Sequence, residues 1–217
     1  MSHRIGRLHV ITDYALQRRW SHVEIARRAA AGGADVVQLR EKMPVSTLQL
    51  MRTASEIRKV VSAGVQLIVN DRADVALAAA ADGVHVGRHD LPAHCAREIV
   101  GSDRLVGGTA NSLEEARRRR DQPFDYIGVG PVYGTTSKEN PAPRLGLEAL
   151  AQIARESRVP VIAIGGIGPD QVAEVMATGV HGIAVLSGIV CADDPEHAAE
   201  RYRLAMEPCV SEWMVES

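Results

Sequence analysis

Short apolar segments alternate with longer segments of helical spacing along almost the whole chain. The apolar segments lie at residues 8–12, 36–40, 66–70, 83–87, 104–108, 125–130, 159–164 and 182–186. Segments with apolar residues at helical spacing follow them at residues 23–31, 46–62, 73–81, 91–100, from 112 onward, 147–156, 169–178 and about 195–205. Uninterrupted apolar strands that alternate with helices are typical of parallel strands covered by helices. Eight such units predict a single-domain (β/α)8 TIM barrel over residues 1–217, with residues 207–217 as a tail of uncertain order. An open doubly wound sheet is the alternative.

Charge and cysteine content exclude several classes of protein. The chain has 25 basic and 27 acidic side chains, a net charge of −2, which argues against a general attraction to nucleic acid or membrane surfaces. The three cysteines, at positions 95, 191 and 209, are widely spaced and form no C-x-x-C motif, so neither a disulfide framework nor a zinc site is expected. No apolar run approaches the roughly 20 residues of a membrane span, and the N-terminus has no signal-peptide pattern. We therefore expect a soluble, cytoplasmic protein.

Polar residues gather where the predicted strands end. Ligands of a (β/α)8 barrel bind at the carboxyl ends of its strands, so these residues are candidates whatever the function. They are Thr12, Gln38, Arg40, Lys42, Asn70, Asp71, Arg88, Asp90, Thr109, the loop 134–138, Gly165, Gly166 and Ser187. The set is rich in cations, amides and hydroxyls, which indicates a binding site more than an ordinary solvated rim.

The segment Gln38-Leu-Arg-Glu-Lys42 places an amide and two cations at every second position. Side chains two residues apart on a strand share one face. The spacing therefore favours an anionic ligand that carries a polar ring. The alternative is an ion pair with Glu41 or with a neighbouring helix.

Two carboxylates follow adjacent predicted strands, Asp71 after the third and Asp90 after the fourth. Together with water and substrate phosphates they are suited to Mg²⁺, which rarely takes an all-protein cage. The alternative is that either carboxylate caps its following helix instead.

Two further segments are suited to phosphate. Thr135, Thr136, Ser137 and Lys138 offer hydroxyls and a mobile cation after the sixth strand, although such a run also suits a polar surface turn. The glycine pair at 165–166 and the Leu186-Ser187-Gly188 segment stand after strands seven and eight, where barrels commonly bind phosphate through backbone amides.

Histidine, the usual acid or base, gives no clear catalytic group here. His9 and His85 lie inside predicted strands, where a structural role is favoured, and His89 can reach a ligand but has no nucleophile to activate. The residues therefore favour a reaction driven by positioning and charge neutralisation.

In these residues the chain resembles the thiamine-phosphate synthase family over nearly its full length. The resemblance is carried by Gln38-Leu-Arg-Glu-Lys42, Asn70-Asp71-Arg72, Gly83-Val-His-Val-Gly87 with Asp90, Asp125-Tyr-Ile-Gly-Val-Gly-Pro-Val-Tyr133 with Thr135-Thr-Ser-Lys138, and Ala163-Ile-Gly-Gly-Ile167. The family joins a hydroxymethylpyrimidine diphosphate to a thiazole phosphate with Mg²⁺ and releases pyrophosphate.

The resemblance implies a role for each matched residue. Gln38 would contact the pyrimidine, and Arg40, Lys42, Asn70 and Lys138 would bind its diphosphate. Asp71 and Asp90 would hold Mg²⁺. Thr135, Ser137, Gly166 and Ser187, with the adjoining Gly165 and Leu186, would bind the thiazole phosphate. Arg40, Lys138 and Thr109 would act on the leaving diphosphate, Thr109 standing where the family usually has serine.

Two other functions remain open from the sequence. The related thiazole tautomerase has a catalytic histidine after the glycine that is Gly130 here, but this chain has Pro131, which cannot transfer a proton. A non-catalytic sensor of thiazole phosphate or thiamine phosphate would not need the cations and carboxylates that suit a leaving diphosphate. The sequence leaves open whether the thiazole is carboxylated, whether the protein is a homo-oligomer, and which of the loops near 41–46 and 134–146 closes over the site.

Overall fold

Eight parallel strands close into a barrel in the computed structural model, which describes residues 4–135 and 142–207. The strands are β1 (Leu8–Asp13), β2 (Val36–Arg40), β3 (Gln66–Asn70), β4 (Gly83–Val86), β5 (Leu105–Ala110), β6 (Tyr126–Val129), β7 (Val161–Ile164) and β8 (Gly182–Val185). Each strand pairs with the next, and β8 returns to β1, where Ile183 lies opposite Leu8. The predicted TIM barrel is confirmed, and the open sheet is excluded.

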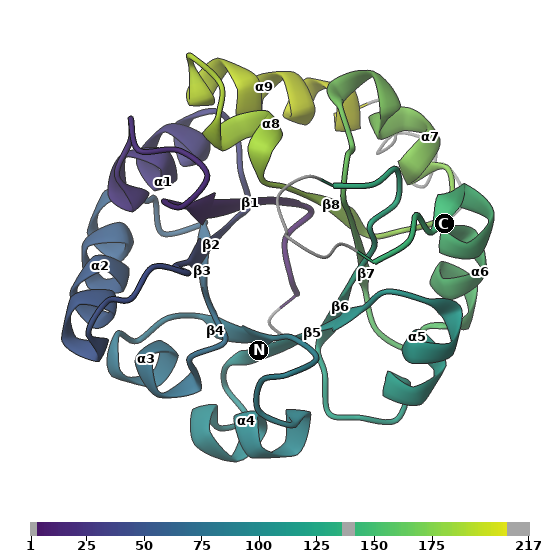
Figure 1. The fold of residues 1–217 in the computed structure, drawn as a ribbon, viewed down its shortest axis with the longest axis horizontal. Coiled ribbons are helices and arrows are strands. Elements are labelled where there is room, and N and C mark those ends of the chain that lie inside the picture. The colour runs from purple at the N-terminus through teal and green to yellow at the C-terminus, as the bar shows by residue number, and fades with distance from the viewer. Residues whose placement is uncertain (1–3, 136–141, 208–217) are drawn as a thin grey trace.

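Helices surround the ring of strands on the outside, as Figure 1 shows in a view along the barrel. They are α1 (His22–Ala31), α2 (Thr47–Val60), α3 (Ala73–Ala78), α4 (Ala93–Val100), α5 (Leu113–Arg119), α6 (Gly146–Glu156), the 3₁₀ turn η1 (Pro169–Gln171), α7 (Val172–Met176), α8 (Ser187–Val190) and α9 (Pro195–Met206). Ser21 and Ser46 open α1 and α2 with capping boxes, in which each serine side chain accepts from a backbone amide three residues later. The short helix α8 was not predicted, because four residues are too few to show a helical period.

The alternation of side chains along each strand separates two apolar layers. Val36 and Ile68 point into the barrel, where they pack with Leu105 and Ile162. Their strand neighbours, such as Val37 and the other members of the larger cluster, pack against the helices. The barrel interior therefore contains an apolar layer, and the polar strand ends lie together at one mouth.

The described part of the chain has no helix long and apolar enough to cross a membrane. Most of the predicted tail, residues 208–217, lies outside the described residues.

Candidate active site

A cavity of about 560 Å³ opens at the carboxyl ends of the strands. Its lining includes most of the predicted site residues: Gln38, Arg40, Lys42, Asn70, Asp71, Asp90, Thr109, Thr135, Gly165, Gly166, Leu186 and Ser187. Arg88 and His89 line it as well. Two further candidates, Thr12 and Gly134, do not line it, and Thr12 is fully buried at the end of β1. Thr136, Ser137 and Lys138 lie outside the described residues. The strand ends thus meet around one cavity, as the barrel prediction required.

The two cations at the end of β2 have separate carboxylate partners. Arg40 pairs with Asp13, the last residue of β1, whose side chain is only 1% exposed. The Nζ atom of Lys42 lies 2.5 Å from Oδ2 of Asp71. Burial lowers the pKa of Arg40, and the negative charges of Asp71 and Glu41 oppose this shift. In the part of the chain that the structure describes, both cations do form ion pairs, but with carboxylates at the ends of β1 and β3 and not with Glu41 or a neighbouring helix.

Asp13 is a site residue that the sequence analysis missed. It follows Thr12 directly at the end of a predicted strand, and that position was the only available signal. Its Oδ1 accepts a hydrogen bond from the amide of Ala15, while Oδ2 meets Arg40. The carboxylate is thereby held in place beneath the guanidinium, which restricts the directions in which Arg40 can point.

Neither carboxylate of the predicted metal pair caps a helix. The N-cap positions of α3 and α4 are Arg72 and Pro92, and neither has a side-chain cap. Oδ2 of Asp90 instead accepts from the amide of Gly87 at 2.7 Å. Burial raises the pKa of Asp90, a hydrogen bond with Asp71 and its negative charge raise it further, and the Gly87 amide opposes them.

Two facing carboxylates of this kind are suited to a divalent cation, whose charge relieves their repulsion. Among residues 4–135 and 142–207, no group of three or more histidine, cysteine, aspartate or glutamate side chains is arranged to hold a metal ion. A cation at Asp71 and Asp90 would therefore complete its coordination with water or ligand oxygens, as Mg²⁺ commonly does.

Three polar side chains at the floor of the cavity are joined by hydrogen bonds. Nε2 of His85 lies 2.8 Å from Oγ1 of Thr109, and Nδ1 lies 3.1 Å from the hydroxyl of Tyr126. Tyr126 is 1% exposed. His85 thus orients the Thr109 hydroxyl from below. His9 contacts the carbonyl oxygen of Gly6 through Nε2, and burial lowers its pKa to about 3, which agrees with the structural role expected for it.

The loops after β6 and β7 pack closely on the other side of the cavity. Gly165 and Gly166 have φ angles of 103° and 71°, which favour glycine. A Cβ atom on Gly165 would lie 2.5 Å from Cα of Pro131, and one on Gly166 would lie 2.6 Å from the carbonyl oxygen of Gly134. The missing side chains let the two loops meet and leave backbone amides near the cavity.

Tyr202 of α9 joins this loop to α8, and the sequence analysis missed it. Its hydroxyl donates to the carbonyl oxygen of Ile167 at 3.0 Å. A Cβ atom on Gly188 would lie 2.3 Å from the same hydroxyl. Tyr202 therefore supports both glycine-containing segments that line the cavity. A tyrosine within an amphipathic helix gives no sequence signal for such a role.

Known proteins with similar sequences and folds agree on one family. The family model described as thiamine monophosphate synthase matches residues 8–189. The chain is 43% identical to a thiamine-phosphate synthase of Salinibacter ruber over 96% of this chain and 92% of that protein. It is 47% identical to one of Chloroflexus aurantiacus over 91% of each. The solved structure of a thiamine phosphate pyrophosphorylase from Pyrococcus furiosus superposes with a TM-score of 0.86 at 38% identity and covers 95% of this chain and 98% of that one.

Sequence, fold and the residues around the cavity thus agree, and the chain belongs to the thiamine-phosphate synthase family.

Proposed function

We propose that this protein transfers the hydroxymethylpyrimidine group from its diphosphate to the ring nitrogen of a thiazole phosphate, and so forms thiamine phosphate and pyrophosphate. One observation carries the proposal. A single cavity has the cations Arg40 and Lys42 beside a pair of carboxylates on one side, and the Gly165–Gly166 loop with Ser187 on the other. Two phosphorylated rings would therefore enter with their phosphates apart and their reacting atoms between them.

The β2 side suits the diphosphate. Arg40, Lys42 and Asn70 offer two positive charges and an amide, and Gln38, which is 5% exposed, offers its amide to the pyrimidine ring. When the bond from the pyrimidine methylene carbon to the diphosphate oxygen breaks, the electron pair leaves with the oxygen. Cations that meet this growing negative charge lower the barrier. The thiazole nitrogen then supplies the electron pair of the new carbon–nitrogen bond, and no protein base is required.

Asp71 and Asp90 would hold Mg²⁺ in this proposal. When bound there, the ion would neutralise charge on the diphosphate. Lys42 contacts the Asp71 carboxylate of this pair. The Thr109 hydroxyl, oriented by His85, would donate a hydrogen bond to the leaving group.

The opposite side of the cavity suits the thiazole phosphate. Thr135, Gly166 and Ser187 line it, with Gly165 and Leu186 beside them, and backbone amides and hydroxyls are common phosphate donors in barrels. We extend this proposal to Ser137, and we assign to Lys138 a contact with the diphosphate, from their positions in the sequence.

A thiazole tautomerase is the nearest competing function. Pro131 lines the cavity at the position where that enzyme has its catalytic histidine, and proline carries no transferable proton. A sensor of thiamine phosphate would have little use for the facing carboxylates of Asp71 and Asp90 beside the two cations. Both observations support the synthase.

A two-substrate assay tests the proposal. Purified protein with Mg²⁺, the pyrimidine diphosphate and the thiazole phosphate is expected to release thiamine phosphate and pyrophosphate in equal amounts. Omission of either ring is the control. Isomerisation of the thiazole alone would identify a tautomerase, and binding without turnover would identify a sensor. Full turnover in excess EDTA would remove the metal from the proposal.

A further inference from the structure

The glutamate between the two cations points away from the cavity that the cations line. Arg40 and Lys42 line the cavity, whereas Glu41 is absent from its lining. Side chains alternate along an extended segment, so Glu41 continues the outer side of Leu39, which belongs to the layer that packs against the helices. The Glu41 side chain is 8% exposed. A nearly buried carboxylate in this position needs partners of its own.

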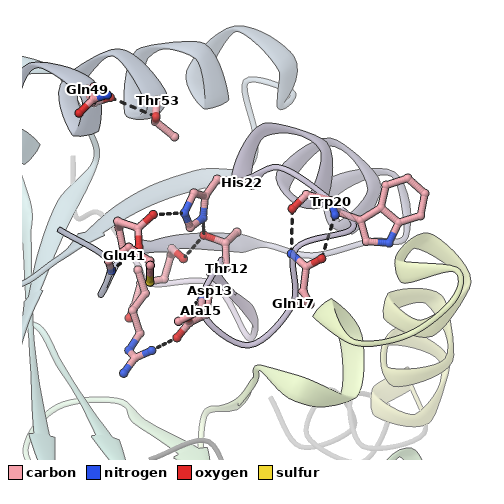
Figure 2. Close-up of polar contacts among 12 residues, drawn as sticks. Thr12, Asp13, Ala15, Gln17, Trp20, His22, Glu41, Gln49 and Thr53 are labelled. Atoms are coloured by element: carbon pink, nitrogen blue, oxygen red, sulfur yellow. Dashed lines mark hydrogen bonds and ion pairs between the residues drawn. The ribbon is translucent and has the colours of Figure 1, made fainter. Parts of the chain in front are cut away.

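His22, at the start of α1, is one of those partners. Its Nε2 atom lies 3.1 Å from Oε2 of Glu41. The other carboxylate oxygen of Glu41, Oε1, accepts a hydrogen bond from the amide of Met43 at 2.6 Å. Because an ionised carboxylate only accepts hydrogen bonds, Nε2 carries the hydrogen of this contact. Figure 2 shows Glu41, His22 and Thr12 in one row of polar contacts.

The histidine ring is held from its other side. Nδ1 lies 2.7 Å from Oγ1 of Thr12, which is fully buried at the end of β1. The same hydroxyl lies 3.4 Å from the carbonyl oxygen of Gln38 on β2. The His22 side chain is 10% exposed. The row therefore links β1, α1 and the end of β2.

The arrangement has an electrostatic consequence at the cavity. Glu41 is adjacent in sequence to both cations, and its charge already acts on Arg40. Within the described residues the Glu41 carboxylate has two hydrogen-bond partners, His22 and the amide of Met43. Without His22 it would lose one of them and would be able to turn toward Arg40 or Lys42. A carboxylate that pairs with these cations competes directly with a bound diphosphate.

We propose that His22 is a positioning residue for the diphosphate substrate: it holds the carboxylate of Glu41 on the outer side of β2, so that no further carboxylate joins Asp13 and Asp71 in pairing with Arg40 and Lys42. The inference rests on the proposed function, since it assigns the diphosphate to these cations. His22 touches no substrate in this assignment and acts only through Glu41.

Removing His22 alone is the first experiment. His22→Leu fills much of the ring's volume but has no donor for Glu41. We expect the KM for the pyrimidine diphosphate to rise by about tenfold, while the KM for the thiazole phosphate stays within twofold. His197→Ala, an exposed histidine of α9, serves as the control and is expected to match the unsubstituted protein. An unchanged diphosphate KM would overturn the proposal.

A second substitution separates positioning from packing. In His22→Leu/Glu41→Gln the released side chain has no charge, so the diphosphate KM is expected to return to that of Glu41→Gln alone. If His22 only supported the fold, Glu41→Gln would not restore the KM, and the proposal would fail. Thermal unfolding of each variant tests whether the lost affinity follows lost stability.

Pyrophosphate binding tests the inference without turnover. Calorimetric titration of each variant with inorganic pyrophosphate and Mg²⁺ should show the same loss in His22→Leu and the same recovery in the double variant. If the two-substrate assay fails but this pattern appears, the proposed reaction is wrong and the role of His22 stands. If the reaction proceeds and the pattern is absent, only the inference fails.

Discussion

The phenolic hydroxyl of Tyr202 donates a hydrogen bond to the backbone carbonyl of Ile167 across 3.0 Å, and thereby links α9 to the loop after β7. The ring is 3% exposed, and its hydroxyl also occupies the space where a Cβ atom of Gly188 would lie. The contact supports both segments of the proposed thiazole phosphate site from behind.

Tyr202→Phe removes this hydrogen bond and keeps the ring. Because a typical intramolecular hydrogen bond contributes about 1 kcal/mol, the KM for thiazole phosphate should rise by roughly three- to tenfold. The KM for the pyrimidine diphosphate should not change. Initial rates measured with each substrate varied in turn check this, and equal rises in both KM values would contradict a local role.

Two substitutions of similar size, Thr109→Ser and Thr109→Val, test the role of the Thr109 hydroxyl. Thr109→Ser keeps the group that contacts His85 and should retain most of the turnover. Thr109→Val keeps the shape but removes the hydroxyl, so kcat should fall by about 10²-fold, as when a donor to a developing oxyanion is lost. Single-turnover rates compare the chemical step directly. Similar kcat values for both variants would remove Thr109 from the leaving-group contacts.

Asp90→Asn should stabilise the metal-free protein while impairing catalysis. The folded pKa of Asp90 lies above its ordinary value of 3.8, so the native state binds the proton more tightly than the unfolded state does. The free energy of unfolding therefore falls as the pH rises from 3.8 through the higher pKa of the folded state, and this loss persists at neutral pH. Asparagine is not ionised and avoids that loss. We expect a higher Tm than the unsubstituted protein at pH 7 without metal, and a smaller rise of Tm on addition of Mg²⁺. A lower Tm at pH 7 would contradict the assignment.

The buried His9 should make the fold sensitive to acid. Its pKa is about 3 in the folded protein, against 6.5 for an ordinary histidine, because burial disfavours the charged ring. The unfolded state therefore gains a proton first, and stability falls as the pH drops from about 6.5 toward 3, by at most about 1.4 kcal/mol per pH unit. Burial also lowers the pKa of His181, which acts in the same direction. Urea unfolding from pH 7 to 4 measures the slope, and His9→Gln should reduce it.

Lys138→Ala should slow the chemical step more than it weakens binding of the thiazole phosphate. The charge that this lysine would meet grows as the diphosphate departs, so its effect belongs mainly to the transition state. Pre-steady-state measurement of product formation, together with thiazole phosphate titration, distinguishes the two effects. Weaker thiazole binding with an unchanged single-turnover rate would reject this role. Lys138→Arg, which keeps the charge, is the matched variant.

Local patterns in the sequence were sufficient to predict the barrel and the side of it that binds ligand. Val36, Val37 and Leu39 are apolar, and the polar groups Gln38, Arg40 and Lys42 come toward and after the strand's end. Such patterns can be read from the sequence because side-chain periodicity and strand ends are properties of neighbouring residues. Nearly all the described candidates then lined one cavity, since parallel strands must end at the same mouth, whereas Thr12 was buried beside it.

Local sequence patterns could not predict which side chains pair across different strands and helices. Asp13 meets Arg40 across two strands, His22 reaches Glu41 from a helix, and Tyr202 contacts Ile167 from 35 residues away. Each pair depends on distances that exist only after the ring of strands has closed and the helices have packed on it. Periodicity along the chain determined which residues face the cavity, whereas the closed barrel alone decided which partners hold them there, because a contact between distant segments has no local pattern.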